Sequence, residues 1–165
     1  MLGGARSGKS AHAEGLVAGA VTYVATGRRD PSDAEWQARI AAHVARRPPE
    51  WSTLETSDLP AALAAVPGTV LVDDLATWLT GVLDDTGAWE GPVDEARARC
   101  DELVDAVARR QEPLVLVSAE VGLGVVPATR SGRLFRDELG SLNARLAQAC
   151  DEVLLLVAGL PLRLR

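Results

Sequence analysis

The chain has 165 residues, 47% of them hydrophobic, which is enough for one domain with a buried core and argues against a disordered protein. Its 17 basic and 23 acidic residues give a formal net charge of −6, and the arginines are dispersed along the chain. This pattern excludes a polybasic surface of the kind that binds a nucleic acid or an anionic membrane, whereas small anions can still bind at local sites. We therefore expect residues 1–165 to form a single domain with no nucleic acid and no membrane among its partners.

The apolar runs and the two cysteines indicate the cellular compartment of the protein. Residues 69–72 and 153–157 are apolar runs far shorter than the ~20 residues needed to cross a bilayer, and the chain has no signal-peptide pattern. Cys100 and Cys150 lack the spacing of metal ligands and suit a reducing compartment better than a disulfide scaffold. We expect a cytoplasmic protein in which both cysteines are buried as small hydrophobic residues.

Short runs rich in β-forming residues alternate with longer amphipathic runs along the chain. The predicted strands are 21–25, 51–55, 69–73, 114–118 and 153–157. The predicted helices are 9–19, 33–46, 58–65, 74–84, 93–110 and 131–149. This alternation is typical of βα units, so we expect an α/β fold with a mainly parallel central sheet flanked by helices.

The first motif is GGARSGKS, residues 3–10, which fits the phosphate-loop pattern G-x-x-x-x-G-K-[ST]. It holds the only lysine of a chain that has sixteen arginines, so this position favours a compact ammonium group over a planar guanidinium. The backbone N–H groups of such a loop and the start of the next helix bind triphosphate oxygens. The predicted nucleotide-binding residues are Gly3, Gly4, Ala5, Arg6, Ser7, Gly8, Lys9 and Ser10.

Within this loop, Lys9 is expected to reach the β- and γ-phosphates and Ser10 to bind Mg²⁺. The alternative is a glycine-rich turn before a helix, which the α/β context makes the weaker interpretation. A phosphate loop normally follows a buried strand, but only Met1 and Leu2 precede Gly3. We therefore expect the first strand to be nearly absent, as if the start had been set too late or residues had been lost.

A histidine follows in the helix predicted over residues 33–46. Trp36, Ile40, His43 and Arg47 recur at intervals of three and four residues, so they share one helical face. Neutral imidazole is a good nucleophile near pH 7 and forms a phosphoramidate with phosphorus, so His43 is a candidate for covalent catalysis. Periodicity alone favours a packed or surface histidine instead. The other histidine, His12, is expected to face solvent.

The run LVDD, residues 71–74, brings two carboxylates to the end of a predicted strand. A carboxylate there can orient Mg²⁺ beside the phosphates, directly or through water. We assign this role to Asp73, because Asp74 is better placed to cap the next helix. The alternative is that both residues simply end a strand.

The segment SAEVGLG, residues 118–124, follows another apolar strand, at the edge where open α/β sheets bind ligands. Glu120 is predicted to belong to the nucleotide-binding site, as a candidate for positioning a substrate hydroxyl or a metal-bound water. The alternative is a plain turn with a solvated carboxylate. Arg130, Arg133 and Arg136 follow at three-residue spacing. They are candidates for contacts with pyrophosphate or a neighbouring subunit, or they form a solvated helix face.

Several segments together resemble a known family. These are GGARSGKS, YVATGRRDPSDAEWQARIAAHVARRPPEWSTLET, LVDDLATWLTGVL, LVLVSAEVGLGVVP and RSGRLFRDELGSLNARLAQACDEVLLLVAGLPL. In this order they resemble the bifunctional adenosylcobinamide kinase/adenosylcobinamide-phosphate guanylyltransferases of cobalamin synthesis, from Gly3 to Leu162. The D-x-E-x-x-x-R-I-x-x-H helix and the E-V-G-x-G-x-V-P segment are specific to that family.

The resemblance implies a three-layer P-loop NTPase-type fold, a homotrimer and two successive reactions. ATP or GTP with Mg²⁺ first phosphorylates adenosylcobinamide, and GTP then gives GMP to a histidine, which passes it to adenosylcobinamide phosphate. His43 falls on the family's guanylylated histidine, so the resemblance reverses the interpretation that periodicity favours.

The chain departs from the family at four positions. The family commonly has methionine at Trp36, cysteine at Asp74, asparagine at Ala119 and glutamine at Ala144. Ala119 directly precedes Glu120, and a second acid at Asp74 can move the metal between neighbouring carboxylates. Two other functions remain open: a kinase without the guanylyltransferase step, and a nucleotide-dependent switch or assembly protein with a structural His43.

Overall fold

The structure is a computed structural model that describes residues 1–28 and 32–165. For six residues of one helix it describes the backbone alone: Glu35, Trp36, Arg39, Ala42, His43 and Arg46. No helix in the described ranges is both long enough and apolar enough to cross a membrane.

Strands and helices alternate as the sequence predicts. The strands are β1 Leu2–Gly3, β2 Val21–Ala25, β3 Ser52–Glu55, β4 Thr69–Asp73, β5 Leu114–Ala119, β6 Leu154–Val157 and β7 Leu160–Arg163. The helices are α1 Lys9–Leu16, α2 Ala34–Arg46, α3 Leu59–Ala65, α4 Leu75–Asp85, α5 Asp94–Arg109 and α6 Arg130–Ala149.

The strands form one seven-stranded sheet in the order β3-β2-β4-β5-β1-β6-β7. Every pairing is parallel except that of β6 with β7, so the predicted α/β class with a mainly parallel sheet is confirmed. Parallel strands end at the same edge of a sheet. The loops that follow β1, β2, β4 and β5 therefore gather at the carboxyl edge, where open α/β sheets bind ligands.

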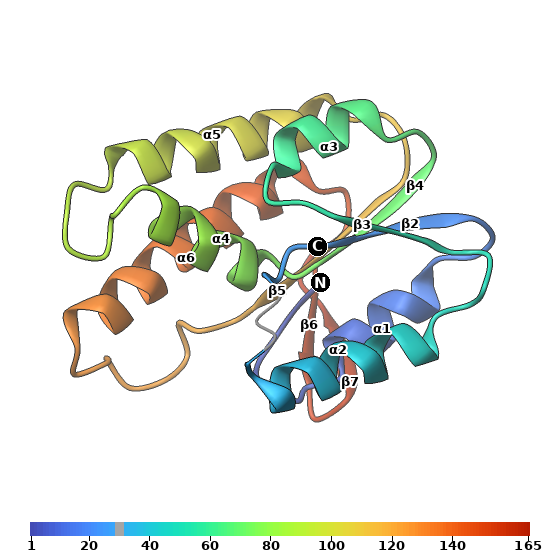
Figure 1. Cartoon of the computed structure of the whole chain (residues 1–165), viewed down its shortest axis with the longest axis horizontal. Helices are drawn as coiled ribbons and strands as arrows, with labels where there is room; N and C mark the ends of the chain where they lie inside the picture. The colour runs from blue at the N-terminus through green and yellow to red at the C-terminus, as the bar shows by residue number, and fades with distance from the viewer. Residues whose placement is uncertain (29–31) are drawn as a thin grey trace.

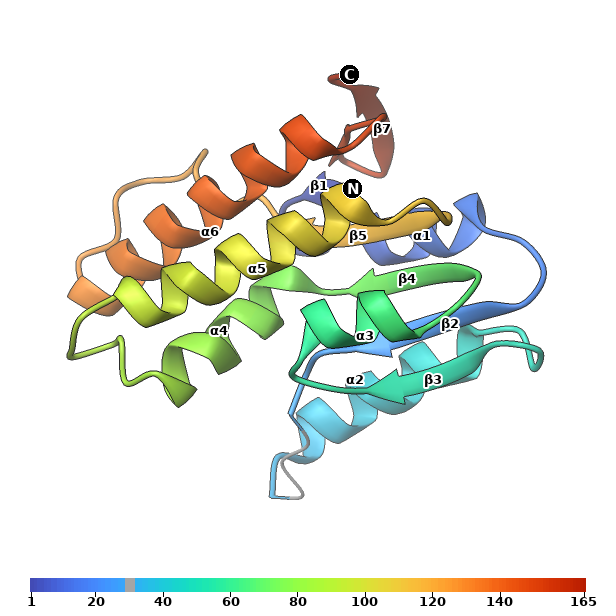
Figure 2. The same cartoon turned by 90° about the horizontal axis from the view of Figure 1, so that it is seen from above.

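The two faces of the sheet are buried by different helices. Figure 1 shows α1 and α2 on one face and α3, α4, α5 and α6 on the other, and Figure 2 shows the latter group from above. Alternate residues of each strand point to opposite faces, so Val70 and Val72 of β4 belong to the core under α3–α6, whereas Leu71 packs near α1. The result is the expected three-layer architecture.

The first strand is short, as expected, whereas the C-terminal end of the chain differs from the prediction. β1 has only two residues, but Leu2 and Gly3 pair with β5 on one side and with β6 on the other. The prediction lacks β7, an exposed antiparallel edge strand that contains Pro161. A tight turn makes this hairpin possible, because Ala158 and Gly159 both have positive φ angles, 52° and 80°.

The helix boundaries agree with the prediction within one residue except at the end of α1. That helix stops at Leu16 rather than at residue 19, because Val17 is extended and Gly19 has a φ of 76°. Cys100 is buried as expected, but Cys150 is half-buried, and both are free thiols.

Candidate active site

The phosphate-loop motif connects the central strand β1 to the start of α1. Gly8, the N-cap of α1, has a φ of 87°, and Arg6 has a φ of 55°. A positive φ favours glycine, so the motif's second glycine stands where the backbone requires it. Within the turn, the N–H of Ser7 donates to the carbonyl of Gly4 at 3.3 Å.

The interior of this loop is tight and polar. A Cβ atom on Gly3 would lie 2.4 Å from Oγ of Ser7 and 3.2 Å from the carbonyl oxygen of Leu156, so no larger residue fits at Gly3 without a shift. Oγ of Ser7 is itself buried and has no hydrogen-bond partner among the described residues. An unpartnered buried hydroxyl inside a loop of this shape fits a polar ligand such as a phosphate oxygen.

Lys9 and Ser10 form the first turn of α1, and both are half-buried. The side chain of Lys9 makes no hydrogen bond or ion pair with any residue that the structure describes. His12 is half-buried rather than solvent-facing, which corrects the prediction. Its backbone N–H donates to the carbonyl of Gly8, and α1 buries Ala13 against the sheet.

The two acids at the end of β4 have different partners. Oδ1 of Asp74 accepts hydrogen bonds from the backbone N–H of Thr77 at 2.8 Å and from its Oγ1 at 2.7 Å, so the prediction that Asp74 caps α4 is confirmed. Oδ2 of Asp73 accepts a hydrogen bond from Oη of Tyr23 at 2.8 Å. A cis peptide bond joins Asp73 to Asp74, and Oγ1 of Thr26 donates to the carbonyl of Asp74 at 2.7 Å.

Glu120 begins the loop after β5, directly beside the phosphate loop. Its backbone N–H donates to the carbonyl of Gly3 at 3.0 Å, and its half-buried carboxylate accepts a hydrogen bond from the N–H of Gly122 at 2.7 Å. The buried amide of Asn143, in α6, donates to the carbonyl of Ala119 at 3.0 Å. The structure therefore joins Glu120 and Gly3 through the backbone.

Two of the first three arginines of α6 support the loop that follows Glu120. Arg136 donates to the carbonyl of Gly122 at 3.1 Å, and Arg133 donates to the carbonyls of residues 127 and 128. Arg130 donates to the carbonyl of Trp89, in the segment between α4 and α5. The row is thus tied to backbone carbonyls rather than fully solvated.

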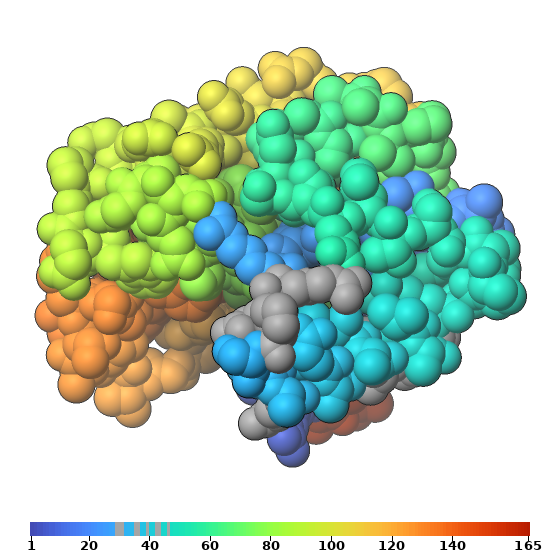
Figure 3. All heavy atoms as spheres, viewed as in Figure 1, coloured from blue at the N-terminus to red at the C-terminus, as the bar shows by residue number. Residues whose placement is uncertain are grey.

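His43 lies in α2, on the same face of the sheet as α1 (Figure 1). Its side chain lies outside the part of the chain that the structure describes. The segment that leads from β2 toward α2 is held at its start by Arg28, whose guanidinium pairs with Asp85 of α4 at 2.5 Å. In Figure 3 this blue segment lies against the green surface of α4, and the surface is hollowed between the orange start of α6 and the cyan segment of α2.

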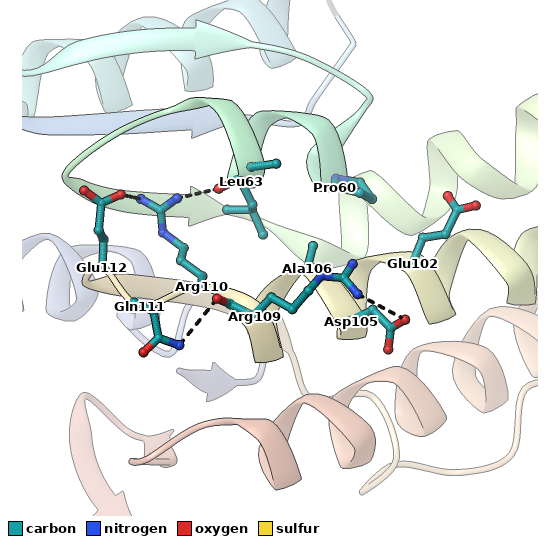
Figure 4. Close-up of a pocket in the computed structure, with 10 residues that line it drawn as sticks. Pro60, Leu63, Glu102, Asp105, Ala106, Arg109, Arg110, Gln111 and Glu112 are labelled. Atoms are coloured by element: carbon teal, nitrogen blue, oxygen red, sulfur yellow. Dashed lines mark hydrogen bonds and ion pairs between the residues drawn. The ribbon is translucent and has the colours of Figure 1, made fainter.

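A separate hollow of about 470 Å³ lies at the opposite edge of the sheet, between α3 and α5 (Figure 4). Arg110 lies beside it with its side chain buried, and donates to the carbonyls of Leu63, Val66 and Gly68. These carbonyls lie at the end of α3 and in the turn before β4. Arg110 therefore has a structural role: it ties the end of α3 and the turn before β4 together at the amino edge of the sheet, remote from the phosphate loop.

Comparisons with known proteins show the family of this chain. Residues 1–164 match the family described as cobinamide kinase / cobinamide phosphate guanyltransferase. The chain belongs to this family. It is 41% identical to the bifunctional adenosylcobalamin biosynthesis protein CobP of Pseudomonas aeruginosa, with 100% of this chain and 95% of the relative covered. It is 40% identical to the protein CobU of Salmonella typhimurium and 37% identical to that of Escherichia coli, which bear the same description, with 100% of this chain and 98% of each relative covered.

Membership of the cobinamide kinase/guanyltransferase family confirms the resemblance stated from the motifs. The sequence interpretation nevertheless missed residues that support the candidate site from within the core, such as Tyr23 and Asn143. Each had a signal: Tyr23 is the only tyrosine of the chain, and Asn143 is a polar residue between the buried Leu139, Leu142 and Leu146 of α6. A polar residue on a buried helical face needs a partner, which the sequence alone does not identify.

Proposed function

We propose that the chain phosphorylates adenosylcobinamide with a nucleoside triphosphate and then converts the product to adenosylcobinamide-GDP with GTP. The observation that carries this proposal is the phosphate loop between β1 and α1, in which Gly8 adopts a φ of 87° in a chain that belongs to the cobinamide kinase/guanyltransferase family. The proposed substrates are adenosylcobinamide, adenosylcobinamide phosphate, ATP and GTP.

In the first reaction, the substrate hydroxyl oxygen attacks the γ-phosphorus of the triphosphate. The bond from this phosphorus to its bridging oxygen breaks, the nucleoside diphosphate leaves, and the hydroxyl proton passes to solvent. The backbone N–H groups of residues 3–10 would bind the phosphate oxygens, and Lys9 would neutralise charge that develops on the β- and γ-phosphates. Glu120, half-buried beside Gly3, would position the substrate hydroxyl.

Mg²⁺ fits the two residues that the sequence analysis assigns to it. Ser10 offers a hydroxyl at the start of α1 and Asp73 offers a carboxylate at the end of β4, and both are half-buried oxygen donors of the kind that Mg²⁺ prefers. The described residues contain no group of three or more His, Cys, Asp or Glu side chains that could hold a metal by themselves, which suits an ion bound partly by phosphates and water. When bound, Mg²⁺ would neutralise charge on the phosphate oxygens.

In the second reaction, an imidazole nitrogen of His43 attacks the α-phosphorus of GTP and pyrophosphate leaves. An oxygen of the corrinoid phosphate then attacks the same phosphorus, the phosphorus–nitrogen bond breaks, and free His43 returns. The position of His43 in α2, on the same face of the sheet as α1, which begins in the phosphate loop, supports this assignment.

The remaining expectations from the sequence belong to the same proposal. We propose that residues 1–165 act as one domain, which the single continuous sheet supports. We also propose a cytoplasmic enzyme, which the free thiols of Cys100 and Cys150 support. We propose a homotrimer as well, on the basis of the family resemblance.

The decisive experiment uses GTP labelled at the α-phosphate. The wild-type chain should retain about one GMP per active chain, acid-labile and stable to base, as a phosphoramidate is. His43→Asn should abolish this label and the formation of the GDP-corrinoid while phosphorylation of adenosylcobinamide continues. A folded His43→Asn variant that labels at the wild-type rate would overturn the assignment.

The same experiment separates the two other functions. A kinase without the second activity would phosphorylate adenosylcobinamide but take no label from GTP. A nucleotide-dependent switch would bind the triphosphate without turnover that depends on a corrinoid.

A further inference from the structure

Tyr23 lies between β4, which ends in the proposed Mg²⁺ ligand Asp73, and α2, the helix that carries His43. It lies in β2, is only 3% exposed and is the only tyrosine of the chain. In the parallel pairing of β2 with β4, Tyr23 lies opposite Leu71, and Asp73 is two residues further along the same face. The side chains of Tyr23 and Asp73 therefore share the face that α1 and α2 cover.

The hydroxyl of Tyr23 holds the carboxylate of Asp73. Oη donates to Oδ2 at 2.8 Å. A tyrosine hydroxyl is protonated near neutral pH, so it donates to the carboxylate that we assign to Mg²⁺.

The ring of the same tyrosine holds Arg47. The guanidinium carbon lies 3.3 Å from the ring centroid, in a cation–π contact, and Nη1 donates to Oγ1 of Thr53 at 3.1 Å. Arg47 directly follows α2, and its backbone N–H donates to the carbonyl of Val44 at 3.2 Å. The contact therefore fixes the C-terminal end of α2, one helical turn after His43, on the sheet.

We propose that Tyr23 is a positioning residue for both reactions: its hydroxyl orients the Asp73 carboxylate, and its ring fixes Arg47 and with it the helix that carries His43. The proposal rests on the proposed function. The hydroxyl and the ring of Tyr23 have separate roles. Removing the hydroxyl should therefore affect Mg²⁺ binding, whereas breaking the contact between the ring and Arg47 should affect guanylylation of His43.

The first test compares Tyr23→Phe with Arg47→Met. Tyr23→Phe keeps the ring and removes the donor, so the Mg²⁺ concentration for half-maximal kinase rate should rise ~10-fold or more, since loss of such a supporting hydrogen bond typically weakens metal binding by this factor. At saturating Mg²⁺, its rate of GMP labelling should stay near that of the wild type. Arg47→Met should do the reverse, lowering the labelling rate while its Mg²⁺ requirement is unchanged.

Two further variants serve as controls, and thermal unfolding tests each variant for loss of structure. Thr53→Val removes the hydrogen bond to Arg47 but leaves the ring contact, so it should label nearly as fast as the wild type. Tyr23→Leu removes both parts and should show both defects. Thermal unfolding shows which variants are folded, and the comparison of Tyr23→Phe with Arg47→Met decides the outcome if Tyr23→Leu is not.

A second test does not depend on turnover. Because the chain has one tyrosine, tyrosine labelled with ¹³C at Cζ gives a single NMR signal that belongs to Tyr23. Adding Mg²⁺ with a non-hydrolysable triphosphate should shift this signal, and Asp73→Asn should remove that response.

The outcomes distinguish the inference from the proposed function. A wild-type chain that takes no GMP label overturns the proposed function whatever Tyr23 does. A wild-type chain that labels, together with a Tyr23→Phe variant of unchanged Mg²⁺ requirement and an NMR signal that does not respond to Mg²⁺, overturns the role of Tyr23 alone.

Discussion

Asn143 and Ser118 form a buried hydrogen bond that joins α6 to the end of β5. Oγ of Ser118 donates to Oδ1 of Asn143 at 2.7 Å, and the amide nitrogen of Asn143 donates to the carbonyl of Ala119 at 3.0 Å. The side chain therefore holds both last residues of β5, immediately before Glu120.

Replacing Asn143 by leucine should destabilise the protein markedly. The change leaves the Ser118 hydroxyl and the Ala119 carbonyl without this partner in the core, at a cost of about 1–3 kcal/mol for each group. Chemical unfolding measures the loss. Adding Ser118→Ala to Asn143→Leu should recover part of it, because the unpaired hydroxyl is then gone, and strictly additive effects would contradict the coupling.

Gly3→Ala should abolish nucleotide binding. The added Cβ would lie 2.4 Å from Oγ of Ser7 and 3.2 Å from the backbone of Leu156, so the loop must shift to accept it. Gly15→Ala is the control, since a Cβ there meets nothing within 4 Å and alanine favours the helix by about 0.5–1 kcal/mol. Calorimetry measures the nucleotide affinity of both variants. Normal affinity in Gly3→Ala would refute the interpretation that the loop has no room for a side chain at Gly3.

The two acids at the end of β4 should separate in their effects. Asp74→Ala removes the cap of α4 and should cost about 0.5–2 kcal/mol of stability, with kinase activity retained at saturating Mg²⁺. Asp74→Ser should restore the stability, because serine also caps helices. Asp73→Asn should instead raise the Mg²⁺ concentration that gives the half-maximal kinase rate. An Asp74→Ser variant with the same Mg²⁺ defect would assign the metal to Asp74.

Lys9→Ala should reduce the kinase rate by about 100-fold or more, as loss of one group that stabilises transition-state charge typically does. The fold should remain, because the side chain of Lys9 makes no hydrogen bond or ion pair with the described residues. Lys9→Arg should not restore the rate, since the planar guanidinium is wider than an ammonium group. Steady-state assays with adenosylcobinamide and Mg²⁺ measure both variants, and full activity in Lys9→Arg would show that charge alone suffices.

Cys100 should make the protein less stable at alkaline pH. Burial raises the pKa of its thiol to about 11, so above a pH of about 8.5 the unfolded chain releases a proton that the folded chain retains. The free energy of unfolding then falls as pH rises, by at most about 1.4 kcal/mol per pH unit. Cys100→Ala should lose this part of the decline. A constant difference between the variant and the wild type from pH 7 to 10 would contradict the prediction.

Local rules were sufficient for most of the elements in this chain. The predicted bounds of β2 and β4 match the structure to the residue, because each strand alternates its side chains between two buried faces. Asp74 caps α4 as its position before an apolar run indicates. The edge strand β7 escaped prediction, since its four residues are exposed and include a proline. Such a strand depends on the turn at Ala158 and Gly159 and on its pairing with β6.

The sequence by itself determined the α/β class, the phosphate loop and the family, because these depend on residue types at fixed spacing within short segments. Only the tertiary structure decided what surrounds Asp73. Tyr23 and Asp73 are 50 residues apart in the chain, and the register of β2 against β4 brings them within 2.8 Å. Ser118 and Asn143 meet in the same way, 25 residues apart. Spacing along the chain carries no information on such contacts, since they exist only once strands pair and helices pack on them.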